Sequence, residues 1–267
     1  MNKILIIGNS VACRAHLVIL INEKSKAEHG LVISDLAKTD TMSFHTAEKC
    51  SSERVIKALS AAPQNQGTII YLELMQSLIK AYMLPETLPE ERIFNALYSV
   101  FFARIWKQSL INAKSESLKN HQSLSENFIT SNCFACIEIN MHSLINFLIF
   151  CRDKDKPEIF LPTMMSSQPC EAFFRTFRSM TATESTVVNF NMLDLLYRAK
   201  RAHMIGKLEM KLPDFKFSRK NYEVGSPAIF SKLPSDEIIN SIAEKAYKAA
   251  VMVFAALGNI KIIMEIY

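Results

Sequence analysis

The interpretation of this chain starts from the stretch Ser166-Ser167-Gln168-Pro169-Cys170-Glu171-Ala172-Phe173-Phe174-Arg175-Thr176-Phe177-Arg178-Ser179-Met180. It predicts a helix with a defined start, because Ser166 and Ser167 can cap it and Pro169 suits a first turn. One apolar face is formed by residues at i, i+3, i+4 and i+7, namely Cys170, Phe173, Phe174 and Phe177. A second, charged face carries Glu171, Arg175 and Arg178. A carboxylate near a helix start, backed by aromatics and flanked by arginines, is a common way to mount an acidic site residue.

The rest of the chain predicts a mainly α-helical fold. It has 267 residues, 49% of them hydrophobic, which allows one large or two modest domains with a sizeable core. Only 6 glycines and 9 prolines are present, so few tight hairpin turns are expected. Apolar periodicity and helix-start signals predict a short strand over Lys3–Ile7 and long helices over 11–22, 46–61, 68–84, 89–112, 132–151, 187–203 and 235–256.

The cysteines and the apolar runs bear on the compartment. The 6 cysteines are irregularly spaced and follow no signal peptide, so we expect reduced thiols in a nuclear or cytoplasmic protein. The longest apolar run, 141–151, is interrupted by polar residues and is shorter than a membrane span requires. We therefore expect no membrane partner.

The positive charge is concentrated in one part of the chain. The net charge is +5, and the segment from Cys170 to Lys220 holds ten Lys or Arg against five Asp or Glu, which accounts for the whole surplus. A basic stretch beside a candidate carboxylate fits a polyanionic partner, whereas charge alone is more often an ordinary solvated helix face. The cations in and after the key helix that are candidates for nucleic-acid contact are Arg175, Arg178, Arg198, Lys200, Arg201 and Lys207.

The key helix also resembles a known family. The order Gln168, Glu171, Phe173-Phe174 and Arg178 is similar to the helix near the C-terminal end of the catalytic domain in P-element-like transposases, with Pro169 standing where that family often has Asp. Further similar segments occur in the same order along the chain, at 8–12, 67–72, 127–132 and 186–190. The resemblance is strongest over residues 127–201 and diffuse over 1–126.

The resemblance implies a fold and a domain organisation. It implies a multi-helix domain with a C-terminal remnant of an RNase H-like α/β fold: a helical insertion-like region at 1–126, an RNase H-like segment carrying Glu171 at 127–230, and a C-terminal helix and tail at 231–267. Glu171 then corresponds to the last catalytic acid and would be a Mg²⁺ ligand in a complete site.

The same resemblance predicts a protein that cannot cut DNA alone. Two-metal phosphoryl chemistry needs several convergent carboxylates, and the aspartates that the family carries upstream are missing here. The resemblance therefore implies a truncated or fragmentary transposase that needs no cofactor of its own. The family's GTP-binding insertion is not matched by a phosphate loop, since neither G-x-G-x-x-G nor G-x-x-x-x-G-K-[ST] occurs. On spacing alone, Glu171 is better read as an i, i+4 partner of Arg175.

Two further polar sets have ordinary structural explanations. Cys133 and Cys136 form a lone C-x-x-C, which lacks the second pair that a structural zinc requires. Glu138 and His142 share a helix face and could form an acid–base or metal pair, but a buried hydrogen-bonded pair in the core is the better prediction.

Three functional hypotheses follow. The first is a transposase-derived protein that binds nucleic acid weakly through residues 170–220 and is catalytically incomplete. The second is a helical protein-interaction module, which would bind a protein partner or itself through exposed apolar helix faces. The third, an autonomous metal-dependent nuclease, requires at least two more carboxylates near Glu171.

Overall fold

The chain is mainly α-helical, as its composition predicts. The computed structural model describes residues 4–37, 43–116, 124–165, 191–211 and 230–257. These fall into two units, one formed by residues 1–160 and 228–267 and the other by residues 161–227. Within the described ranges the only sheet has two short strands, so an RNase H-like remnant stays a prediction.

The larger unit contains a short hairpin and most of the helices that the structure describes. Its strands are β1 (Leu5–Ile7) and β2 (Ser10–Ala12). Its helices are α1 (Arg14–Glu23), α2 (Lys26–His29), α3 (Phe44–Cys50), α4 (Glu53–Leu59), α5 (Gln66–Tyr82), α6 (Pro89–Glu116), α7 (Leu124–Asn127), α8 (Ser131–Asp153) and α11 (Asp236–Ala256). Single 3₁₀ turns lie at Ile33–Leu36, Pro63–Asn65 and Pro157–Ile159.

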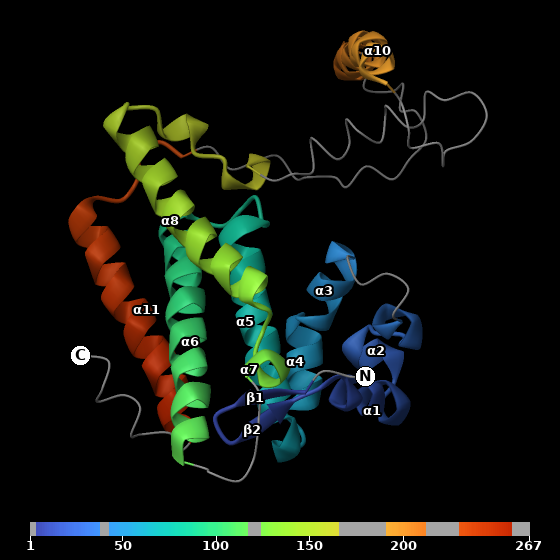
Figure 1. Cartoon of the computed structure of the whole chain (residues 1–267), viewed down its shortest axis with the longest axis vertical. Coiled ribbons are helices and arrows are strands. Elements are labelled where there is room, and N and C mark those ends of the chain that lie inside the picture. The colour runs from blue at the N-terminus through green and yellow to red at the C-terminus, as the bar shows by residue number, and fades with distance from the viewer. Residues whose placement is uncertain (1–3, 38–42, 117–123, 166–190, 212–229, 258–267) are drawn as a thin grey trace. The chain divides into compact units, whose positions relative to one another are not determined.

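Helix α6 is the centre of this unit. It packs against α11, α5 and α8, and Figure 1 shows α11 on one side of it and α5 on the other. The apolar stripe predicted for this helix is confirmed as core, because Ile93, Val100 and Trp106 are all fully buried. A helix that is apolar on several sides is expected where three neighbours surround it.

The sole tryptophan ties α6 to the N-terminal hairpin. The indole Nε1 of Trp106 donates a hydrogen bond to the backbone carbonyl of Ile6 in β1. The ring also meets Phe128 edge-on, with centroids 4.7 Å apart, and Phe102 at 6.1 Å. Burying an indole together with a partner for its N–H avoids the cost of an unpaired polar group.

The hairpin lies directly against the start of α5. Its strands pair antiparallel, with Leu5 opposite Ala12 and Ile6 opposite Val11. A Cβ atom on Gly67 would come within 2.5 Å of the Val11 carbonyl carbon and oxygen, so this close approach requires glycine. Beside it, the Thr68 hydroxyl lies 2.7 Å from His16 Nδ1 and accepts a hydrogen bond from the Cys13 backbone at 3.1 Å.

A buried arginine closes the turn between α5 and α6. Arg92 is 1% exposed, and its guanidinium donates to the carbonyl of Ala81 in the last turn of α5 and to those of Leu84 and Pro85 just beyond the helix. The last carbonyls of a helix lack partners within the helix, so a cation placed there satisfies them. Burial lowers the pKa of this guanidinium.

Most of the predicted helices are found, with instructive differences. The helix predicted to start at Val11 starts at Arg14, because residues 10–12 pair as β2. The helix predicted over 46–61 is two helices, because the Ser51 hydroxyl donates to the Ala47 carbonyl at 2.8 Å and Ser52 occupies the N-cap of α4. The final helix starts after Ser235 as expected.

The prediction of a buried Glu138–His142 pair is wrong. His142 is exposed, and the partner of Glu138 is Arg104 on α6. Periodicity placed His142 within an apolar helix, but α8 buries only the face that carries Met141, Leu144 and Leu148.

Helix α8 is long and apolar enough to cross a bilayer on length and composition alone. It is longer than the run considered in the sequence, and it is the one helix in the described part of the chain that meets this criterion. The core helices of water-soluble proteins meet it too. A single helix of this kind is no convincing sign of a membrane protein.

Candidate nucleic-acid interface

The candidate site lies on α10 (Met192–Lys211), the long helix among the described residues of the smaller unit. Asn191 caps its start: the side-chain Oδ1 accepts from the Asp194 N–H at 2.8 Å, and its backbone carbonyl accepts from Leu195 at 3.0 Å. Asn and Asp are favoured before a helix because their side chains satisfy the first backbone donors. The helix starts later than the predicted residue 187, and it extends past the predicted end at or slightly beyond residue 203, since Ile205 and Leu208 continue the apolar pattern.

One side of α10 is partly covered and the other is exposed. Ala202 is buried, and Leu195, Ala199 and Ile205 are partly covered. The opposite side carries exposed apolar side chains together with exposed cations, namely Leu193, Leu196, Tyr197, Lys200, Arg201, Met204, Lys207 and Leu208. The helix therefore offers an amphipathic, basic surface rather than a purely charged one.

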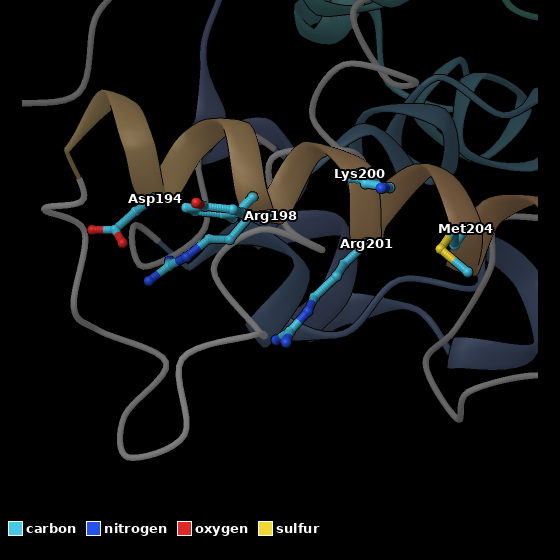
Figure 2. Close-up of a pocket in the computed structure, with 6 residues that line it drawn as sticks. Asp194, Arg198, Lys200, Arg201 and Met204 are labelled. Carbon is cyan, nitrogen blue, oxygen red and sulfur yellow. The ribbon is translucent and has the colours of Figure 1, made fainter.

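A pocket of about 390 Å³ lies along this helix. The described residues that line it are Asp194, Tyr197, Arg198, Lys200, Arg201 and Met204. Figure 2 shows Asp194, Arg198 and Arg201 projecting from the same side of α10, with Met204 further along the helix. Among the described lining residues three cations stand against one carboxylate, and this positive balance favours an anionic ligand.

The structure brings together only part of the predicted set. Arg198, Lys200 and Arg201 line one pocket, and Lys207 is exposed on the same helix about two turns beyond Lys200. Glu171, Arg175 and Arg178 lie outside the described residues, as does the whole predicted helix that carries them. The acidic centre at Glu171 stays a prediction.

No family model matches the chain, and no curated protein or solved structure matches it either. The resemblance to P-element-like transposases thus rests on the sequence motifs alone.

The described residues do not assemble a metal site. Within the described ranges no group of three or more His, Cys, Asp or Glu side chains could hold a metal ion. Asp194 is the single carboxylate among the described pocket residues. Asp35 is a carboxylate of the larger unit that already has structural partners. Its Oδ2 accepts from the Val32 N–H at 2.9 Å, and its Oδ1 lies 3.4 Å from Lys49 Nζ. The positive charge of these described pocket residues suits the binding of an anion.

Sequence reasoning missed three of the described pocket residues, Asp194, Tyr197 and Met204. Tyr197 is 68% exposed and Met204 is 57% exposed, although both are large and largely apolar. Their spacing could have indicated a shared face, since Leu193, Tyr197, Met204 and Leu208 follow i, i+4, i+11 and i+15.

Proposed function

We propose that this chain is a transposase-derived protein that binds nucleic acid through α10 and does not cut it unaided. The observation that supports this best is the gathering of Arg198, Lys200 and Arg201 around one pocket of a basic helix. Lys and Arg side chains that contact phosphates supply most of the sequence-independent affinity for nucleic acids. The origin from a transposase rests on the motif resemblance around Glu171.

The absence of a complete catalytic site is part of the proposal. Nuclease or strand-transfer chemistry by two Mg²⁺ ions needs carboxylates that converge on both ions. Glu171, by resemblance, is a single acid, and the described residues contribute no cluster that completes it. A protein of this kind would keep its affinity for nucleic acid without the ability to hydrolyse it.

The test is fluorescence anisotropy with labelled oligonucleotides at several salt concentrations. The variant Lys200→Ala/Arg201→Ala/Lys207→Ala should weaken binding. The slope of log K against log salt concentration should become less negative by roughly 2 to 3. A matched control is Lys154→Ala/Lys156→Ala/Lys245→Ala, which removes the same charge from exposed positions outside α10. The proposal fails if the wild type does not bind at low salt, or if both variants weaken binding equally.

A second function is favoured by a different observation on the same helix. Leu193, Leu196, Met204 and Leu208 of α10 are each more than half exposed, and clustered exposed apolar side chains mark protein-interaction surfaces. On this alternative the chain is a helical interaction module. Sedimentation velocity over a range of concentrations tests self-association, and Leu193→Asp/Leu208→Asp should abolish any concentration dependence.

A further inference from the structure

An exposed aromatic side chain sits among the pocket cations. Tyr197 is 68% exposed, although burying its ring would remove a large apolar area from water and stabilise the fold. It lines the same pocket as Lys200 and Arg201, which are three and four residues further along the helix. Those spacings place the three side chains on neighbouring positions of one helix face.

The flat ring adds a kind of contact that cations alone cannot make. Phosphate contacts position a nucleic acid, whereas an aromatic ring can stack on the face of an unpaired base. The exposed apolar neighbours Leu193 and Met204 lie one turn before Tyr197 and two turns after it, so they extend the apolar surface on both sides of the ring. A strip of this kind can shield a base from water while the cations neutralise its backbone.

This combination favours a single strand over a duplex. In a duplex the base faces are already stacked on each other, and only their edges are accessible in the grooves. In a single strand each base presents a free face, and groove-lining cations with stacking aromatics are the usual means of binding it. The cations from Lys200 to Lys207 span roughly 10 Å of helix axis, enough to follow a short stretch of backbone.

We propose that the α10 pocket binds single-stranded nucleic acid, with the Tyr197 ring stacked on one base and Lys200 and Arg201 contacting the adjacent phosphates. The inference rests on the proposed nucleic-acid function and specifies which form of nucleic acid this site takes.

The test compares three fluorescent probes with the full-length chain by anisotropy. The probes are a 15-nucleotide oligothymidylate, a strand of equal length made of abasic residues, and a duplex hairpin. The variants are Tyr197→Leu, which removes the ring but keeps an apolar side chain, and Tyr197→Phe, which keeps the ring. Because Tyr197 is largely exposed, neither variant should change the fold, and circular dichroism verifies this.

The expected results separate stacking from charge. Tyr197→Leu should weaken oligothymidylate binding roughly 5- to 150-fold, the effect of losing one stacked base. It should leave binding of the abasic strand and the hairpin unchanged, and Tyr197→Phe should behave like the wild type on all three probes.

Two failures are distinguishable. If the wild type binds the probes and Tyr197→Leu binds oligothymidylate equally well, the stacking inference is wrong while nucleic-acid binding stands. If the wild type binds none of the three probes at low salt, the proposed function itself is wrong, and the apolar strip on α10 belongs to a protein interface.

Discussion

Arg104 on α6 and Glu138 on α8 form a two-pronged ion pair. Nε of Arg104 donates to Oε1 of Glu138 at 2.8 Å, and Nη2 donates to Oε2 at 2.6 Å. Arg–carboxylate pairs with two parallel hydrogen bonds are stronger and more directional than single contacts. The hydrogen bond from Arg104 lowers the pKa of Glu138.

Replacing this carboxylate should cost a modest, pH-dependent amount of stability. We expect Glu138→Gln to lower the free energy of unfolding at pH 7 by about 1 kcal/mol or less, because the Arg104 side chain is 48% exposed and solvent screens the pair. A lowered folded-state pKa contributes stability that is present above the unfolded pKa of about 4.3 and is lost as the pH falls through the folded value. The difference between wild type and variant should therefore vanish at low pH.

Urea unfolding at pH 7 and at pH 3 measures this difference. Glu244→Gln is the control, since Glu244 is highly exposed and lies 3.9 Å from Lys248. A control as destabilised as Glu138→Gln would show that the two-pronged geometry contributes nothing.

The contact between the hairpin and α5 predicts a glycine that cannot be replaced. Gly67→Ala would place a Cβ atom 2.5 Å from backbone atoms of Val11, which can only be relieved by moving the strand. We expect a loss of about 1 to 3 kcal/mol, as for other overpacked sites. Thermal unfolding followed by circular dichroism measures it.

Gly30→Ala is the informative comparison. A Cβ atom on Gly30 would meet no heavy atom within 4 Å, but the backbone there has φ of +76°. Its cost is therefore conformational, about 1 to 2 kcal/mol. Replacement by asparagine tests the difference in origin, because asparagine tolerates a positive φ and should recover part of the loss at position 30, whereas at position 67 it keeps the Cβ contact with Val11.

Four of the five described cysteines should divide into two classes of reactivity, with Cys13 of intermediate exposure between them. Cys133 and Cys136 are exposed, whereas Cys50 and Cys151 are buried. Burial raises the pKa of Cys50 to about 11 and that of Cys151 above its usual value, so both remain protonated thiols at pH 8. A time course of iodoacetamide labelling read by mass spectrometry should show Cys133 and Cys136 modified first. Cys50 modified at the same rate in the folded protein would contradict the burial described here.

The larger unit should fold without the smaller one. The larger unit is built from two chain segments, 1–160 and 228–267. These segments are in contact near the point where residues 161–227 connect them, since the rings of Phe160 and Phe230 have centroids 6.5 Å apart. Arg152 joins the same segments by donating to the Pro234 carbonyl at 3.0 Å and pairing with Asp236 at 2.8 Å. We expect a chain with residues 161–229 replaced by a six-residue Gly-Ser linker to unfold cooperatively and to keep the blue-shifted emission of buried Trp106.

The same deletion isolates the role of α10. Under the proposed function it should abolish nucleic-acid binding, and a deleted chain that still binds would move the interface to the larger unit. Red-shifted tryptophan emission in the native buffer would show instead that the larger unit needs the missing residues.

The sequence predicted the long helices and the first short strand well, and most other short elements poorly. The opening Pro-Glu-Glu and the apolar stripe of α6 are consistent helix signals that extend over many residues. A helix of this kind can therefore be predicted from its sequence. The strand at Ser10–Ala12 was missed because a three-residue strand gives almost no periodic signal, and it is held by contacts with α5 some 55 residues away. The Arg104–Glu138 pair could not be predicted, since residues 34 apart meet only through helix packing.

The candidate site was predicted in part for a similar reason. Composition and helix spacing correctly placed Arg198, Lys200 and Arg201 on one basic helix, because charges at i, i+2 and i+3 stay close wherever the helix lies. Which side of that helix is covered depends on tertiary structure, so the exposure of Tyr197 became visible only in three dimensions. The segment around Glu171 lies outside the described residues and stays a prediction.

The discontinuous construction of the larger unit also dictates when it can form during synthesis. Helix α6 makes its most extensive packing with α11, which begins about 120 residues after α6 ends. At the usual 5 to 20 residues per second, a ribosome needs roughly 6 to 24 s to reach that point. During this interval the side of α6 that α11 will cover is exposed on the nascent chain. The larger unit can therefore finish folding only after α11 has been synthesised, and until then its exposed apolar surface is prone to aggregation.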